Sequence, residues 1–130
     1  MSLELTCLGW ASVLGLFHII VAGNARTKEF GAKWNVSARD DKKPPLSPFT
    51  DRLFRAQSNF FETFPLFASA VLIVAVLQNS NVYSQSAALI YLVARIIYFP
   101  LYAYGVPVIR TVVWLFSITG LLLVLLPPLL

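Results

Sequence analysis

The chain has 130 residues, enough for one ordinary domain, and carries a formal net charge of +4. It is 58% hydrophobic and only 12% charged, whereas soluble domains are about 45–50% apolar and roughly 25% charged. This composition excludes intrinsic disorder, which requires low hydrophobicity and high charge. It also argues against a water-soluble domain, whose surface would have to be built from large apolar side chains. We therefore expect an all-α integral membrane protein.

The first apolar stretch, residues 3–23, is close to the length of about 20 residues that a helix needs to cross the hydrocarbon core. Cys7 is the only cysteine, which excludes an intrachain disulfide and a thiolate metal cluster. We expect it to be a small packing residue. His18 has no second type of metal ligand near it in this stretch. We interpret it as a packing residue too, and no metal site is predicted.

Residues 24–48 carry most of the charge and three prolines, so they are expected to form a solvated loop. Eight of the ten basic residues lie between Arg26 and Arg55, mixed with acids. Membrane proteins gather Lys and Arg in cytoplasmic loops, so this cluster indicates topology rather than nucleic-acid binding. We expect this loop and the connection before Arg110 in the cytoplasm, and both termini on the non-cytoplasmic side.

The second apolar stretch, residues 49–77, holds Arg55, Asn59 and Glu62 at the spacing i, i+4, i+7. This spacing stacks the three side chains on one face of a helix. Ionisable groups inside a spanning helix are costly, so they face the bundle interior and mark a function. A direct pair between Arg55 and Glu62, two turns apart, would be strained.

The third stretch, residues 82–104, holds Arg95, Tyr98 and Tyr102 at i, i+3, i+7, again one stripe. The fourth stretch covers residues 106–129, with a proline in its expected first turn, where proline is favoured. The chain is thus predicted to be a single four-helix transmembrane domain over residues 1–130, with the helices running up and down.

Two interpretations of the polar stripes remain open. One is a structural ion-pair network, for instance Glu62 with Arg95. The other is a binding site, because we count four arginines, Arg26, Arg55, Arg95 and Arg110, against Glu62 as the acid among them. A closed network should balance its charges, whereas an excess of guanidinium groups suits a ligand with carboxylates or phosphates.

Three segments resemble one family. Residues 55–67, RAQSNFFETFPLF, closely resemble the second-helix signature of the MAPEG superfamily, the membrane-associated proteins in eicosanoid and glutathione metabolism. Residues 91–102, YLVARIIYFPLY, are similar to its third helix, and residues 105–110, GVPVIR, to the stretch with its catalytic arginine. The family includes microsomal glutathione transferases, cysteinyl-leukotriene synthase and a prostaglandin E synthase.

The resemblance implies a homotrimeric four-helix bundle with glutathione bound between neighbouring subunits near the cytoplasmic side. In such a site Arg55 would hold a carboxylate, Glu62 the ammonium group and Asn59 the amides of the peptide. The remaining members of the implied site would be Arg95, Tyr98 and Tyr102 from the same chain, with Gln57 and Arg26 contributed by the adjacent subunit.

The resemblance also implies that Arg110 is catalytic and stabilises the glutathione thiolate. A free thiol has a pKa near 8.5, so only a few per cent is thiolate at neutral pH. A guanidinium beside the sulfur lowers that pKa. The thiolate would then attack a lipophilic electrophile or reduce a lipid hydroperoxide, with this second substrate arriving from the bilayer. Glutathione is the implied co-substrate, although the sequence leaves another small thiol open.

The chain also departs from the characterised members. Thr63 follows Glu62, where leukotriene-forming members have a tyrosine. The long loop with its DDKKPP segment is unlike the eicosanoid enzymes and is similar to an uncharacterised bacterial branch. We accordingly expect a bacterial inner membrane protein.

Two other function classes remain open. A non-catalytic lipid-binding or scaffold protein with the same fold would retain the pocket without turning over a substrate. A transporter or channel is disfavoured, because the four stretches show no internal repeat.

Overall fold

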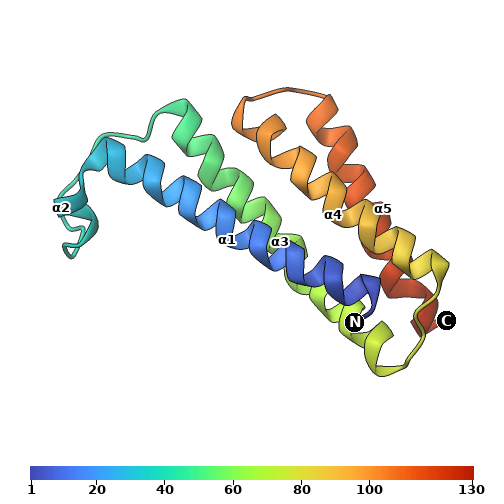
Figure 1. The fold of residues 1–130 in the computed structure, drawn as a ribbon. Coiled ribbons are helices and arrows are strands. Elements are labelled where there is room, and N and C mark those ends of the chain that lie inside the picture. Colours follow the sequence, from blue (N-terminus) through green and yellow to red (C-terminus); the bar gives the residue numbers. More distant parts are fainter.

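The structure is a computed structural model that describes all 130 residues, and it is entirely helical (Figure 1). Its helices are α1 (Leu3–Phe30), α2 (Ala32–Asn35), α3 (Pro48–Val76), α4 (Val82–Ala103) and α5 (Ile109–Leu129). The four long helices are each long and apolar enough to cross a membrane. The expectation of an all-α chain with four spans is confirmed.

The first helix extends well beyond the expected boundary at residue 23, so the prediction of a loop over residues 24–48 is wrong in its first part. No proline or glycine interrupts the chain between Gly23 and Gly31. Gly31 then ends α1 with φ at +94°, a conformation that favours glycine, and its N–H donates to the Thr27 carbonyl. The short helix α2 follows directly, and the extended connection to α3 begins only after it.

Side-chain caps explain where three of the long helices begin. Ser2 accepts a hydrogen bond from Leu5 N and Ser47 from Thr50 N, and Asn81 forms a reciprocal capping box with Ser84. Ser47 also donates its backbone N–H and its hydroxyl to the carboxylate of Glu29, at 2.8 and 2.9 Å. This contact ties the end of α1 to the start of α3.

Small residues mediate the close helix contacts. A Cβ atom at Gly120 of α5 would lie 2.7 Å from the Ala87 carbonyl and 2.9 Å from the Tyr91 nitrogen of α4. Gly15 of α1 similarly receives the ring of Phe60 of α3. Lipid tails are as apolar as leucine, so helices in a membrane associate by close packing of this kind rather than by the hydrophobic effect.

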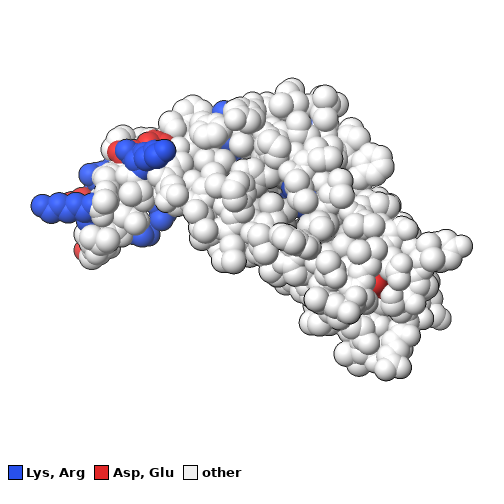
Figure 2. All heavy atoms as spheres, viewed as in Figure 1, with Lys and Arg blue, Asp and Glu red and all other residues white.

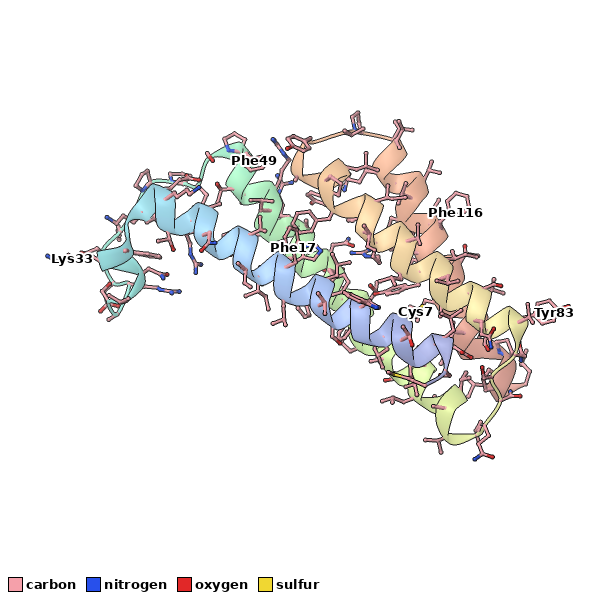
Figure 3. All side chains as sticks on the ribbon, viewed as in Figure 1. Cys7, Phe17, Lys33, Phe49, Tyr83 and Phe116 are labelled. Atoms are coloured by element: carbon pink, nitrogen blue, oxygen red, sulfur yellow. The ribbon has the colours of Figure 1, made fainter.

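The two ends of the bundle differ in chemistry. Both chain ends lie together at one end and α2 lies at the other (Figure 1). Most charged side chains visible in Figure 2 gather around α2. Phe116 points away from the bundle in Figure 3, and both Phe116 and Phe17 are more than half exposed. This exposure of large apolar side chains fits a surface covered by lipid or by another protein.

Candidate functional site

An arginine-lined cavity lies where α3, the end of α4 and the start of α5 meet. Its volume is about 170 Å³. The lining residues are Arg52, Arg55, Tyr102, Gly105, Val106, Pro107 and Arg110. Three of the predicted site residues, Arg55, Tyr102 and Arg110, thus converge from three different helices. We call this space the arginine cavity.

The ring of Tyr102 lies close to two of these cations. The Cζ atom of Arg110 lies 4.6 Å from the centre of the ring, and that of Arg55 lies 5.7 Å from it. A guanidinium within about 6 Å of an aromatic centre is attracted by the ring quadrupole. Tyr102 therefore helps to hold both guanidinium groups at the cavity, in addition to offering its hydroxyl.

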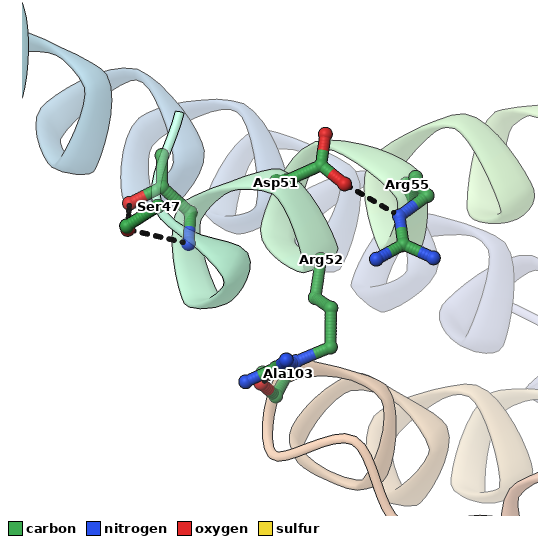
Figure 4. Close-up of polar contacts among 6 residues, drawn as sticks. Ser47, Asp51, Arg52, Arg55 and Ala103 are labelled. Carbon is green, nitrogen blue, oxygen red and sulfur yellow. Dashed lines mark hydrogen bonds and ion pairs between the residues drawn. The ribbon is translucent and has the colours of Figure 1, made fainter. Parts of the chain in front are cut away.

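Arg55 also has an acidic partner on its own helix. Its Nε atom lies 2.9 Å from Oδ2 of Asp51, one turn earlier, and both side chains are about half exposed (Figure 4). The count of four arginines against Glu62 alone is therefore wrong, because it overlooked Asp51. A half-exposed pair of this kind contributes little to stability, about 0–1 kcal/mol. It orients Arg55 rather than anchoring the fold.

Arg52 is a cavity residue that the sequence interpretation missed. Its Nε donates to the carbonyl of Ala103, at the end of α4, over 2.9 Å (Figure 4). The available signal was its spacing: Arg52 precedes Arg55 by three residues, which places both on neighbouring positions of one helix face.

The turn before Arg110 has an unusual backbone. Gly105 has φ at +68°, and Val108 has φ at +60° and ψ at −63°. Ile109 N donates to the Pro107 carbonyl over 2.6 Å, which closes a three-residue γ-turn around Val108. This conformation is strained for a β-branched residue, and such strain concentrates at functional sites.

The same turn corrects the predicted start of the fourth helix. Residue 106 and Pro107 do not belong to it, because the positive φ of Val108 lies outside the helical region. The helix α5 begins at Ile109, and Arg110 is therefore in its first turn. The prediction that Pro107 occupies the first turn of the helix is wrong.

A second part of the predicted site lies deeper in the bundle. Arg95 is 1% exposed, and its Nη2 donates to Oδ1 of Asn59 over 2.9 Å. Its guanidinium also lies 4.5 Å from the ring of Tyr98, which in turn contacts Tyr102 with 5.6 Å between the ring centres. The stripes on α3 and α4 therefore form one connected cluster that leads to the arginine cavity.

Arg95 is incompletely satisfied within this cluster. Its Nε and Nη1 atoms are buried and have no hydrogen-bond partner in the chain. Burying unpaired donors is costly, and the cost is largest for a charged group. These two donors therefore mark a position where a ligand or water is needed.

Glu62 is exposed and forms no ion pair with Arg55 or with Arg95. The alternative of a structural ion-pair network, in which Glu62 pairs with Arg95, is therefore not formed in this structure. The one ion pair in the chain is the exposed pair of Arg55 and Asp51. The excess of unpaired guanidinium groups remains, which favours a binding site over a structural network.

Arg26 and Gln57 lie outside the arginine cavity. The Cζ atom of Arg26 lies 4.9 Å from the ring centre of Phe54 and 5.8 Å from that of Trp34. The Nε atom of Arg26 and the Oε1 atom of Gln57 are both buried without a partner in the chain. Neither residue contributes to the cavity of its own chain.

His18 packs as a ring between two aromatic residues. Its ring centre lies 5.0 Å from that of Phe60 and 4.1 Å from that of Phe99, while its Nδ1 atom has no partner.

Thr63 shares a hydrogen bond of 2.9 Å with the hydroxyl of Tyr91 inside the bundle. No group of three or more His, Cys, Asp or Glu side chains lies close enough together to hold a metal ion.

The family comparison covers nearly the whole chain. The family model described as the MAPEG family matches residues 5–130. A search of curated proteins and a search of solved structures gave no significant match. The resemblance inferred from the helix signatures is confirmed by the family match.

Proposed function

Because the chain belongs to the MAPEG family of membrane glutathione-related transferases and synthases, we propose that it is a glutathione-dependent transferase or peroxidase. Its substrates are lipophilic electrophiles or lipid hydroperoxides that reach the protein from the bilayer. The observation that carries this proposal is the convergence of Arg55, Tyr102 and Arg110 on one cavity that has no acid in its lining. Such a cavity suits an anionic ligand.

The residues divide the work according to their positions. Arg110, in the first turn of α5, stabilises the thiolate, and Arg55 holds a carboxylate of glutathione. Asn59, Arg95, Tyr98 and Tyr102 continue the site along the connected cluster, with the two free donors of Arg95 facing a ligand group. Glu62, exposed on α3, takes the ammonium group.

A single chain supplies only part of this site. The cavity of about 170 Å³ is smaller than the roughly 300–1,000 Å³ of typical complete ligand sites. We propose that a homotrimer completes it and that the adjacent subunit provides Arg26 and Gln57. The charged end around α2 faces the cytoplasm and both termini face the opposite side of a bacterial inner membrane.

The chemistry follows from the thiolate. Arg110 favours the anion, and each unit by which the thiol pKa falls corresponds to about 1.4 kcal/mol of differential stabilisation. In transfer, the thiolate forms a carbon–sulfur bond as the electrophile's leaving group departs or its double bond takes up a proton. In hydroperoxide reduction, two glutathione molecules become the disulfide while the hydroperoxide becomes an alcohol and water.

The first experiment measures the ultraviolet difference absorbance of the glutathione thiolate at neutral pH on adding detergent-solubilised protein. We expect a thiolate signal with the natural chain and a loss of about tenfold or more with Arg110→Ala, since one pKa unit is a tenfold change. Arg39→Ala is the matched control, because Arg39 is exposed and its guanidinium donates hydrogen bonds only to Asn35, far from the cavity in sequence and outside its lining. An undiminished signal with Arg110→Ala would refute the catalytic role.

A second candidate is a non-catalytic lipid-binding protein, which an apolar groove favours. This groove of about 360 Å³ lies between α1, α3 and α4. Its lining includes Leu14, Phe17, Phe49, Ile96 and Phe99. In a transferase the same groove would hold the lipophilic substrate. Tight fatty-acid binding by a folded protein that does not bind glutathione would favour this candidate.

A further inference from the structure

The arginine cavity holds more positive charge than a thiolate alone requires. Three guanidinium groups line it, and no carboxylate does. Asp51 partly compensates Arg55 through its contact with Nε, and the proposed function assigns Arg110 to the sulfur. Arg52 is therefore left as a cation in the cavity with no anionic partner in the chain.

The side chain of Arg52 is held in place on one side and free on the other. Its Nε donates to the Ala103 carbonyl, and this bond is its one hydrogen bond in the chain, so Nη1 and Nη2 have no partner. The guanidinium lies across Gly105, where a Cβ atom would be 3.4 Å from Nε and 3.5 Å from Cδ and Cζ. The guanidinium therefore packs at van der Waals distance against the turn that precedes Arg110.

A guanidinium fixed through Nε and free at both Nη atoms is pre-organised to bind an anionic group. Arginine is suited to carboxylates because its planar fork donates two parallel hydrogen bonds. Ordering a long arginine side chain costs conformational entropy on binding. The bond to Ala103 has already restricted that freedom before the ligand arrives.

From this geometry we propose that Arg52 is a further binding residue, which holds a carboxylate of the thiol substrate while Arg110 faces the sulfur. The proposal rests on the proposed function and deepens it. The ligand class becomes a thiol with a carboxylate near enough to its sulfur for both to occupy one cavity of about 170 Å³. In glutathione this is the carboxylate of the glycyl residue, and the γ-glutamyl carboxylate is left to Arg55.

The test compares two ligands against two proteins. Glutathione and its monoethyl ester, esterified on the glycyl carboxylate, are titrated by calorimetry into the natural chain and into Arg52→Gln. We expect the natural chain to bind glutathione about ten- to a hundredfold more tightly than the ester, the range for a hydrogen-bonded charged group. Arg52→Gln should bind the two ligands equally, to within about twofold.

A purely structural role of Arg52 gives a different result. If Arg52 acted only by holding the turn, Arg52→Gln would weaken both ligands equally and the preference for the free carboxylate would persist, which would overturn the proposal. Arg39→Gln is the control and should keep the full preference, because Arg39 lies in the exposed loop. Thermal unfolding verifies that each variant is folded.

The remaining outcomes separate this proposal from the proposed function. If the natural chain binds glutathione and the ester equally, the role of Arg52 is wrong while the function stands. If the natural chain binds neither, both are wrong. Should Arg52→Gln not fold, Arg52→Lys replaces it. Lysine keeps the positive charge but cannot donate the two parallel hydrogen bonds of a guanidinium. We therefore expect a reduced preference for glutathione over its ester, and an unchanged preference would contradict the proposal.

Discussion

At the scale of single residues, Arg95 is a charged group that the bundle buries almost completely. Its aromatic neighbours Phe60 and Tyr98 lie with their ring centres 5.6 and 4.5 Å from its Cζ atom. Its one side-chain hydrogen bond is to Asn59. Removing one partner of a buried hydrogen bond costs about 1–3 kcal/mol, and more for a charged group, because the other partner stays buried and unpaired.

We therefore predict that Asn59→Leu destabilises the ligand-free protein by about 1–3 kcal/mol, since it leaves Arg95 without a side-chain partner. The double variant Asn59→Leu with Arg95→Met should recover most of this loss, because removing both partners is nearly neutral. Thermal unfolding in detergent measures both effects. Ser58→Ala is the control, since Ser58 is exposed. Additive losses in the double variant would show that the pair is not coupled.

At the scale of helices, contact between α4 and α5 depends on one glycine. A Cβ atom at Gly120 would lie 2.7 Å from the carbonyl oxygen of Ala87, which is shorter than ordinary contact distances. This oxygen belongs to the backbone of α4, so it cannot rotate away as a side chain could. The helix α5 also carries Arg110 at its start. Any displacement of α5 away from α4 therefore also displaces Arg110 and changes the arginine cavity.

Gly120→Ala is expected to destabilise the protein by about 1–3 kcal/mol, because the added methyl group forces the two helices apart. Gly9→Ala is the matched control: Gly9 also lies in a helix, but nothing lies within 4 Å of its Cβ position. That substitution should stabilise by about 0.5–1 kcal/mol through helix propensity. In thermal unfolding, the melting temperature should fall for Gly120→Ala and rise for Gly9→Ala. A shift of the same sign and size in both variants would refute the close contact.

At the scale of the whole molecule, polar groups hold both ends of the bundle. At the end with the chain termini, Glu4 is buried and accepts hydrogen bonds from Ser80 and Ser84, at 3.0 and 2.7 Å. At the other end, Glu29 accepts two bonds from Ser47. The arginine cavity lies between α3, α4 and α5, whereas Arg26 lies on α1 outside it.

This separation yields a test of the proposed trimer. Two variants, Arg110→Ala and Arg26→Ala, are co-expressed and purified as mixed assemblies. Each variant is expected to give little thiolate signal by itself. If Arg26 of one subunit serves the cavity of its neighbour, about one site in four combines both natural residues in a randomly mixed ring. Roughly a quarter of the thiolate signal should then return. Recovery of no signal would mean that Arg26 serves the cavity of its own chain.

Much of the architecture follows from local sequence signals. The four spans and the polar stripes on α3 and α4 are each predicted from composition and helical spacing within one segment. The stripe from Arg95 to Tyr102 is predicted by spacing, and the structure confirms that its members contact one another.

The errors also have a common origin. The extension of α1 to Phe30 differs from the predicted loop because arginine, lysine and glutamate, which are common in loops, are also good helix formers. Arg52 and Asp51 were missed because they belong to a charged segment in the sequence, while in space Arg52 meets the end of α4. The γ-turn at Val108 has no sequence signature, since valine disfavours it.

The sequence by itself determined that the chain is a four-span helical membrane protein of the MAPEG family, because hydropathy and signature spacings are properties of single segments. Only the tertiary structure decided that Arg52 shares a cavity with Arg55 and Arg110, and that Arg95 is buried against Asn59. The reason is physical. In a membrane the surfaces that face lipid and those that face another helix are equally apolar, so close packing at residues such as Gly120 selects the contacts.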